Sequence, residues 1–291
     1  MSTTAPHVRP RVVTTVAEVR EIVAAERAVG HTISLTPTLG ALHDGHLSHL
    51  AHAGKIADTR FVSIFVNPLQ FGPSEDLDKY PRTLDDDLDK LAAIGVPYVF
   101  APSVDEMYPG GEPDVHVTAG RVGSLYEGHS RPGHFDGVLT VVAKLLLIVT
   151  PDFVTFGNKD AQQQFLVRQM VRDLNIAVSV EAIETVREHD GLALSSRNRF
   201  LDEKERRAAR SLSLALEAAA SSADRGIDSV IAAAQGTLMG EALVELDYLK
   251  IVRPETFLPV DDDYRGPALV LVAARVGTTR LIDNERITLA G

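Results

Sequence analysis

The feature that most constrains the fold is an alternation of short apolar runs with segments of helical periodicity, which continues through the first two thirds of the chain. Such an alternation is typical of a parallel sheet covered by helices. It predicts an α/β domain in which each strand is short and mostly buried. The predicted strands are residues 32–36, 61–66, 98–101, 153–156 and 177–182, and the predicted helices are residues 16–28, 45–57, 83–94, 138–148 and 160–174.

The pattern changes after Glu184. The Ala- and Arg-rich residues 203–223 predict a long helix. Asp202 stands at its N-cap, and Glu205 is placed to complete a capping box. The elements predicted beyond this helix are a second helix at residues 227–239 and strands at residues 244–252, 268–275 and 279–287, separated by turn residues.

The length of 291 residues is sufficient for two domains. We expect a parallel-sheet domain over residues 1–185 and a smaller α+β domain with an antiparallel sheet over residues 186–291. The sequence contains no cysteine, which excludes thiol catalysis, disulfides and cysteine-based metal sites.

The charge balance limits the partners that the protein can have. There are 29 basic and 40 acidic residues, and the resulting net charge of -11 disfavours binding to nucleic acid. No apolar run reaches the ~20 residues that cross a bilayer, so no membrane association is expected. Residues 1–11 lack the apolar core of a signal peptide and are expected to be a frayed terminus. These observations favour a cytoplasmic protein.

The predicted helix at residues 83–94 begins with an acidic run. Thr83 can act as its N-cap, and Asp85, Asp86 and Asp87 fall in the first turn, where negative charge favours the helix dipole. A metal site formed by the three aspartates is the alternative interpretation.

The most informative segment is residues 36–46, which connect the first predicted strand to a helix. In an open α/β sheet, ligands bind at the carboxyl ends of the strands. Gly40 and Gly45 have the spacing of a P-loop, but His46 stands where such a loop has lysine, which disfavours a Walker-type ATPase. The sequence also has no G-x-G-x-x-G motif, which disfavours a nicotinamide-dependent dehydrogenase.

His43 and His46 lie at the predicted start of the helix, where backbone amides and the helix dipole favour an anion. Two imidazoles at this position can donate hydrogen bonds to phosphate oxygens. They would then stabilise the charge that builds on an α-phosphate during nucleotidyl transfer. Gly45 between them permits a close backbone approach.

The histidines recur at every third position through His49 and His52, as they would in a metal-binding ladder. At about 100° per residue, His43 and His52 lie on opposite faces of a helix, so four ligands to one ion are excluded. A site formed by two neighbouring histidines remains an alternative. Otherwise His49 and His52 are expected to be surface residues.

Two further clusters carry polar side chains that suit a nucleotide. In the first, Lys159 can reach a phosphate while Asp160 holds a ribose hydroxyl or caps a helix. The alternative for this cluster is a plain turn at Gly157 followed by an N-cap. In the second, residues 194–199 (Leu-Ser-Ser-Arg-Asn-Arg) can close on a triphosphate or form an ordinary polar loop. We expect all of the clusters to converge in one cleft.

In combination these motifs resemble those of the pantoate-β-alanine ligase family, in the nucleotidylyltransferase superfamily, over residues 12–287. A lone His-x-Gly-His motif would indicate only the superfamily, which also contains class I aminoacyl-tRNA synthetases. The segments that carry the resemblance are residues 37–46, 65–72 (Phe-Val-Asn-Pro-Leu-Gln-Phe-Gly), 80–82 (Tyr-Pro-Arg), 131–135 (Arg-Pro-Gly-His-Phe), 157–163 (Gly-Asn-Lys-Asp-Ala-Gln-Gln) and 194–199.

The resemblance implies a Rossmann-like N-terminal domain, a smaller C-terminal domain, a homodimer and a Mg2+-dependent reaction in two steps. ATP and pantoate would form pantoyl adenylate and pyrophosphate. β-Alanine would then displace AMP to give pantothenate, a step in coenzyme A biosynthesis.

The resemblance also assigns roles to particular residues. It implies that His46 is the residue usually described as the proton donor, and that His43, Lys159 and Arg197 act with it in catalysis. Gln70 and Gln163 would hold pantoate, with Gln70 also near β-alanine. The residues that would contact ATP are Leu39, Gly40, Ala41, Leu42, His43, Asp44, Gly45, His46, Gly157, Asn158, Lys159, Asp160, Val186, Leu194, Ser195, Ser196 and Arg197.

The chemistry of pantoate bears on the role of His46. A carboxylic acid with a pKa near ~4 is ionised at neutral pH, so pantoate needs no base for the first step. We therefore expect catalysis by alignment and charge stabilisation, and we discount a literal general-acid role for His46.

Two other functions compete with this one. A sister adenylyltransferase that acts on a phosphorylated substrate would need cations where Gln70, Gln163 and Asn67 stand. A non-catalytic nucleotide-binding protein of the same fold would have lost a residue such as His46 or Lys159, and both are present.

Overall fold

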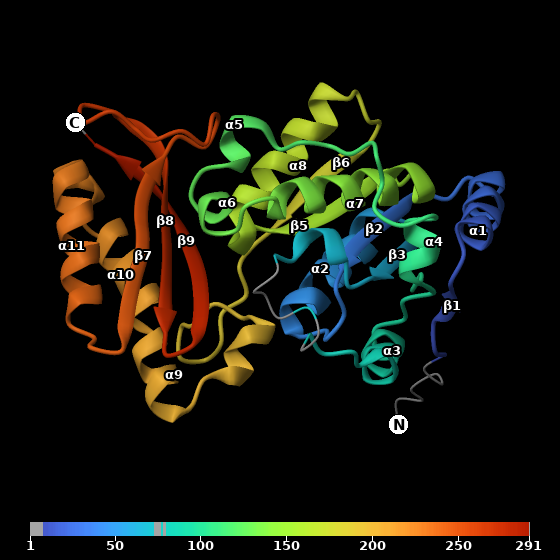
Figure 1. Cartoon of the computed structure of the whole chain (residues 1–291), viewed down its shortest axis with the longest axis horizontal. Coiled ribbons are helices and arrows are strands. Elements are labelled where there is room, and N and C mark those ends of the chain that lie inside the picture. The colour runs from blue at the N-terminus through green and yellow to red at the C-terminus, as the bar shows by residue number, and fades with distance from the viewer. Residues whose placement is uncertain (1–7, 73–76, 78–79, 291) are drawn as a thin grey trace. The chain divides into compact units, whose positions relative to one another are not determined.

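The structure is a computed structural model that describes residues 8–72, 77 and 80–290, and these residues group into two units (Figure 1). The first unit comprises Met1–Gly157 and Gln163–Ile183, and the second comprises Asn158–Gln162 and Glu184–Gly291. The short segment with Lys159 is therefore grouped with the C-terminal part of the chain.

A parallel sheet organises the first unit, which confirms the predicted α/β class. Its strand order is β1-β4-β3-β2-β5-β6, and every pairing between neighbours is parallel. The sheet can be followed behind the helices in Figure 1. The strands are β1 (Arg11–Val13), β2 (Ile33–Thr38), β3 (Thr59–Ile64), β4 (Tyr98–Phe100), β5 (Phe153–Gly157) and β6 (Ser179–Ile183).

The first strand was not predicted, and the expectation of a frayed terminus was wrong at Arg11. Arg11 belongs to β1 and pairs with Tyr98 of β4. An edge strand of three residues is too short to show a period in the sequence. Residues 1–7 lie outside the described part of the chain.

Two layers of helices cover the two faces of this sheet. On one face, α1 (Val16–Ala28), α7 (His134–Val149) and α8 (Ala161–Asp173) share an apolar core with the strand residues Leu35 and Phe61. On the other face, α2 (Asp44–Ile56) and α3 (Leu84–Ala93) pack with Val62 and Val99. Phe61 and Val62 are adjacent residues on opposite faces, as the period of a strand requires. Short helices follow at α4 (Val104–Met107), α5 (Gly120–Gly123) and α6 (Glu127–Ser130).

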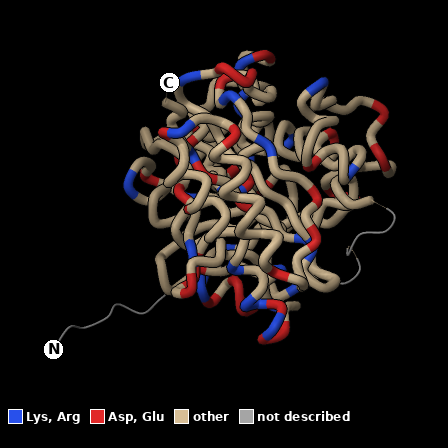
Figure 2. The backbone as a smooth tube through the Cα atoms, turned by 90° about the vertical axis from the view of Figure 1, so that its left-hand side faces the viewer, with Lys and Arg blue, Asp and Glu red and all other residues tan. Residues whose placement is uncertain are grey.

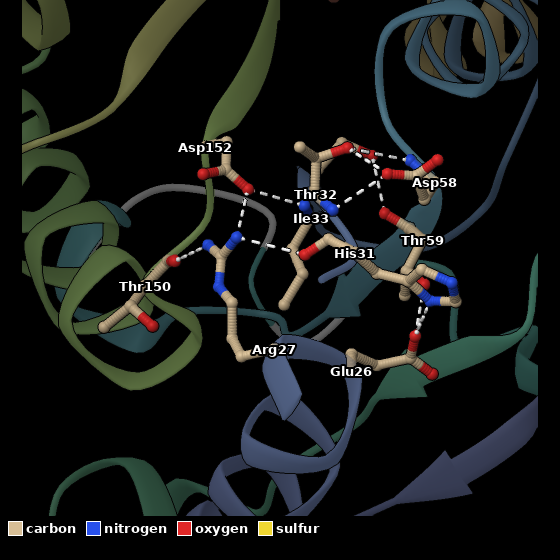
Figure 3. Close-up of polar contacts among 10 residues, drawn as sticks. Glu26, Arg27, His31, Thr32, Ile33, Asp58, Thr59, Thr150 and Asp152 are labelled. Atoms are coloured by element: carbon tan, nitrogen blue, oxygen red, sulfur yellow. Dashed lines mark hydrogen bonds and ion pairs between the residues drawn. The ribbon is translucent and has the colours of Figure 1, made fainter. Parts of the chain in front are cut away.

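A polar cluster joins the end of α1 to the amino-terminal edge of the sheet (Figure 3). Asp152, just before β5, accepts hydrogen bonds from the Arg27 guanidinium at 2.6 Å and from the Ile33 backbone N–H at 2.7 Å. The same guanidinium donates to the carbonyl oxygen of Thr150 at 2.9 Å. Burial raises the pKa of Asp152. The hydrogen bonds from Arg27 and Ile33 and the charge of Arg27 lower it by a larger amount, so the pKa lies below its usual value.

Replacing Asp152 with alanine is expected to reduce stability in a pH-dependent way. The side chain is 35% exposed, so after solvent screening we expect a loss of about 1–2 kcal/mol at pH 7. Because the pKa is lower in the folded state, this contribution is present above the unfolded-state pKa of ~3.9 and is lost as the pH falls through the folded-state value. Urea unfolding at pH 7 and pH 3.5 checks the result. An equal difference between wild type and Asp152→Ala at both pH values would contradict it.

The second unit contains an antiparallel sheet of order β7-β8-β9, as predicted. Its helices are α9 (Glu203–Ala209), α10 (Ser211–Ala220) and α11 (Ile227–Met239), and its strands are β7 (Val244–Val252), β8 (Gly266–Val276) and β9 (Thr279–Leu289). The predicted capping box of Asp202 and Glu205 is present. The single helix predicted at residues 203–223 is instead divided at Arg210 into α9 and α10. Arg210 keeps helical backbone angles, and its carbonyl oxygen still accepts from the Leu214 N–H at 3.1 Å, so the break is slight.

Among the described residues, no helix has both the length and the apolar character that crossing a membrane requires. Charged positions of both signs are mixed along the chain. In the view of Figure 2, the described Lys and Arg positions are interspersed with Asp and Glu positions.

Candidate active site

The predicted site segments follow three neighbouring strands. β3 and β5 flank β2 on opposite sides, so the chain moves away from β2 in one direction and later returns on the other. A ligand crevice in such a sheet lies at the carboxyl ends of the strands where the order reverses. Residues 39–43 follow β2, the 3-10 helix η1 (Pro68–Gln70) comes shortly after β3, and η3 (Asn158–Asp160) follows β5.

The loop after β2 has an unusual backbone. Gly40 and Ala41 have φ angles of 86° and 51°, and such positive values are uncommon for alanine. The backbone N–H groups of Ala41 and Leu42 both donate to the carboxylate of Asp87, at 2.9 and 2.7 Å. These two amides are therefore satisfied by a carboxylate of the protein itself.

The acidic run at the start of α3 does not act as one group. Asp85 is exposed and pairs with Arg9 at 3.3 Å, whereas Asp87 is fully buried. Thr83 does not cap the helix with its side chain, contrary to the prediction. Its hydroxyl instead donates to Asp87 at 3.2 Å. In the ranges that the structure describes, no group of three His, Cys, Asp or Glu side chains is arranged to hold a metal ion.

His43 and His46 begin α2 and form a reciprocal cap. The Gly45 N–H donates to Nδ1 of His43 at 3.2 Å, and the His43 N–H donates to Nδ1 of His46 at 3.4 Å. Because each Nδ1 accepts a hydrogen bond, each neutral imidazole carries its proton on Nε2. The two rings stack with centroids 4.1 Å apart.

The ring of His43 lies against the backbone of residue 45, so this position requires glycine. A Cβ at this position would lie 2.9 Å from both Cε1 and Nδ1 of that ring. Any side chain at residue 45 would therefore displace the first histidine of the motif.

The outer histidines are half-buried on α2, and the side chain of His52 is 39% exposed. The ring of His49 lies edge-on to that of His46, with centroids 6.5 Å apart. Nε2 of His52 lies 3.6 Å from the carboxylate of Glu181 on β6.

Gln70 is held by a network of buried groups. Nδ2 of the buried Asn67 donates to Oε1 of Gln70 and to the Gly137 carbonyl oxygen, both at 3.1 Å, and Oδ1 of Asn67 accepts from the Tyr108 hydroxyl at 2.7 Å. Burial raises the pKa of Tyr108, which keeps it a donor. With Oε1 engaged by Asn67, the amide NH2 of Gln70 points the other way.

The Arg-Pro-Gly-His segment at residues 131–134 supports the same turn. Nδ1 of His134 bonds to the Gln70 carbonyl oxygen at 2.8 Å, and Nε2 of the same ring bonds to the Arg131 guanidinium at 2.9 Å. Sequence reasoning included these residues in the resemblance but assigned them no role. Gln163, the other predicted pantoate residue, lies half-buried in α8 of the same unit.

Gly157 is the last residue of β5 in the first unit. The remaining predicted residues belong to the second unit, where β9 holds two of their segments. Asn284 donates from Nδ2 to the carbonyl oxygens of Asn158 and Lys159, both at 2.9 Å. The preceding residue, Asp283, is buried and pairs with Arg187 at 2.6 Å. In the sequence, Asp283 and Asn284 belong to the polar run Asp-Asn-Glu-Arg at residues 283–286, which does not single them out.

Arg187 lies in a short hairpin that brings two predicted ATP residues together. The Leu194 N–H donates to the Val186 carbonyl oxygen at 2.9 Å. Burial lowers the pKa of Arg187, but the hydrogen bond and charge of Asp283 raise it above its ordinary value, so Arg187 stays cationic. The Lys159 ammonium lies 3.9 Å from the Asp160 carboxylate in η3.

The loop that follows this hairpin is closed by its own side chains. The Ser195 hydroxyl accepts from the Arg197 N–H at 3.3 Å and so caps η4 (Ser196–Phe200). Asn198 is buried and donates to Glu188 at 2.8 Å and to the Ala193 carbonyl oxygen at 3.1 Å. Ser196 and Arg197 are thus held on a short, internally bonded turn.

Comparison with known proteins decides the family. The sequence profile of the pantoate-beta-alanine ligases matches residues 11–286. The chain belongs to the pantoate-β-alanine ligase family. It is 54% identical to the pantothenate synthetase of Leifsonia xyli over 289 residues, which is 95% of this chain and 99% of that protein. The corresponding enzyme of Thermobifida fusca is 52% identical, with 99% of each chain covered.

Solved structures of the pantoate-β-alanine ligase family have the same architecture. The pantothenate synthetase of Thermus thermophilus superimposes with a TM-score of 0.89 at 45% identity, over 94% of this chain and 98% of that one. The Francisella tularensis ligase, described as complexed with β-γ ATP and β-alanine, gives a TM-score of 0.78 at 31% identity, over 95% and 97% of the chains. The fold is therefore that of a pantoate-β-alanine ligase, and the chain is an enzyme of this family.

Proposed function

We propose that this ligase joins pantoate to β-alanine through a pantoyl adenylate. In the first step, a carboxylate oxygen of pantoate forms a bond to the α-phosphorus of ATP, and the bond to pyrophosphate breaks. In the second step, the amine of β-alanine forms an amide bond at the acyl carbon, AMP leaves and the amine releases a proton. The product is pantothenate.

The pair of imidazoles at the start of α2 is the observation that carries this proposal. Each Nδ1 is engaged by a backbone amide, so the Nε2–H groups of His43 and His46 are the donors that the rings can offer. Preorganised donors of this kind stabilise charge on phosphate oxygens without a proton transfer. This chemistry suits a nucleophile that is already ionised.

The orientation of Gln70 fits the proposed acceptor. Its amide turns an NH2 group away from Asn67, and a neutral NH2 can bond to a carboxylate or hydroxyl of pantoate without neutralising the nucleophile. Gln163 is proposed to bind the same substrate, and Gln70 also to contact β-alanine. A phosphorylated acceptor would favour a cation at these positions.

The residues proposed to bind ATP are residues 39–46, residues 157–160, Val186 and residues 194–197. Lys159 and Arg197 would supply positive charge to the triphosphate. Mg2+ is proposed to enter as part of the MgATP substrate, because this ion keeps phosphate and water oxygens and needs only one or two protein carboxylates. We further propose a cytoplasmic homodimer with no nucleic-acid or membrane partner.

Partial-reaction assays test the proposed chemistry. AMP formation should require ATP, pantoate and β-alanine together, whereas exchange of labelled pyrophosphate into ATP should require pantoate alone. A sister adenylyltransferase would release pyrophosphate with a different acceptor and ignore pantoate. Binding of ATP without turnover under any combination would indicate a non-catalytic protein, and either outcome would overturn the proposal.

A further inference from the structure

Asp87 is a buried carboxylate in the core beneath the loop that leads to the two histidines. Its exposed fraction is 0%, although the neighbouring residues Asp85 and Asp86 are exposed. Each carboxylate oxygen accepts one loop amide: Oδ1 accepts from Leu42 and Oδ2 accepts from Ala41. A charged group buried at this depth is retained only where such bonds compensate for the loss of water.

A second contact from the same helix fixes the other side of the loop. The Lys90 ammonium donates to the carbonyl oxygen of Leu42 at 2.6 Å. α3 thus binds both the N–H and the C=O of Leu42, the residue directly before His43. Leu42 is itself buried, with an exposed fraction of 2%.

The backbone of this loop needs such support. Ala41 has a φ of 51°, a left-handed conformation that is unfavourable for a residue with a Cβ unless the surroundings hold it. Consecutive N–H groups that turn toward one side form a concave anion site. In a P-loop such a site holds a phosphate, whereas here the carboxylate of Asp87 occupies it.

We propose that Asp87, assisted by Lys90, is a positioning residue for adenylation, which holds Ala41 and Leu42 so that His43 and His46 present their Nε2–H groups to the α-phosphate. The inference rests on the proposed function. It assigns the buried carboxylate a role in adenylation, because the loop directs the imidazoles that are proposed to bind the α-phosphate.

Replacing Asp87 with asparagine is the test. One oxygen becomes an NH2 group that faces a loop N–H, so one of the two amide bonds is lost. We expect pantoate-dependent pyrophosphate exchange to fall by about 10- to 100-fold, as small misplacements of catalytic groups do. When pantoyl adenylate is supplied, the KM for β-alanine in the ligation step should be unchanged. Asp85→Asn makes the same chemical change on the exposed side of the helix turn and should leave both half-reactions unchanged.

A double-mutant cycle separates positioning from general stability. If Asp87 acts through the histidines, Asp87→Asn should cost much less in a His46→Ala background than in the wild type. Equal costs in both backgrounds, or an unchanged exchange rate in folded Asp87→Asn, would overturn the proposal. If Asp87→Asn does not fold, Lys90→Met provides the test. This variant should exchange pyrophosphate about threefold or more slowly than the wild type, and a rate equal to that of the wild type would overturn the proposal. Failure of the wild type to exchange pyrophosphate with pantoate would instead reject the proposed function.

Discussion

His46→Ala is expected to lower the rate of pantoate-dependent pyrophosphate exchange by about 100-fold or more. The substitution removes an Nε2–H donor from the start of α2 at the place where charge is proposed to build on the α-phosphate. It also removes the Nδ1 acceptor of the His43 N–H, but both groups lie at a helix terminus, so the fold should persist. Steady-state exchange kinetics and circular dichroism on the same sample provide the measurement.

His46→Gln distinguishes the two roles that this imidazole can have. Glutamine retains a hydrogen-bond donor but cannot transfer a proton, so partial recovery over alanine is expected if the ring only donates. A general acid would make both variants equally slow. Wild-type turnover in a folded His46→Ala variant would show that the catalytic site lies elsewhere.

Gly137→Ala is expected to damage the fold of the first unit severely. A Cβ there would lie 2.7 Å from the amide nitrogen of Gln70 and closer still to the carbonyl oxygen of Leu69. Both are backbone atoms of the turn that carries the proposed pantoate residue, so α7 or the turn must move. We expect a loss of about 3 kcal/mol or more, seen as insoluble protein or a large fall in Tm.

The matched control is a glycine with open space around it. Gly236 lies in α11, and a Cβ there would meet nothing within 4 Å. Gly236→Ala should therefore stabilise the protein by about 0.5–1 kcal/mol, because alanine loses less backbone entropy in a helix. A Gly137→Ala variant that unfolds at the wild-type temperature would show that the turn adapts freely.

Elements with a strong period could be predicted from the sequence nearly residue for residue. The predicted bounds of α1, α11 and β7 agree with the structure. The period does not reveal the break between α9 and α10, because Arg210 keeps helical backbone angles there. A three-residue edge strand such as β1 is too short to show a period. Its pairing partner β4 also lies far along the chain, so no local pattern indicates the pairing.

In the candidate site too, some residues could be predicted from the sequence and others could not. The motif residues could be found because glycine and histidine have a strong local meaning at a strand–helix junction. Their supports could not, since the three aspartates at the start of α3 have the same local pattern and only tertiary packing buries Asp87 alone. Tyr108 and Asn284 also contact their partners across long stretches of chain, at 41 and 126 residues of separation.

The adjacent residues Asp283 and Asn284 make the length of the C-terminal hairpin a constraint on enzyme engineering. Successive side chains of a strand project to opposite faces, so inserting or deleting one residue in the turn between β8 and β9 would move both members of this pair to the opposite face. After an insertion, the Asp283 carboxylate would take the place of the Asn284 amide and face the carbonyl oxygens of Asn158 and Lys159, and Arg187 would lose its partner. Tags, loop grafts and circular permutations should therefore leave this turn at its present length.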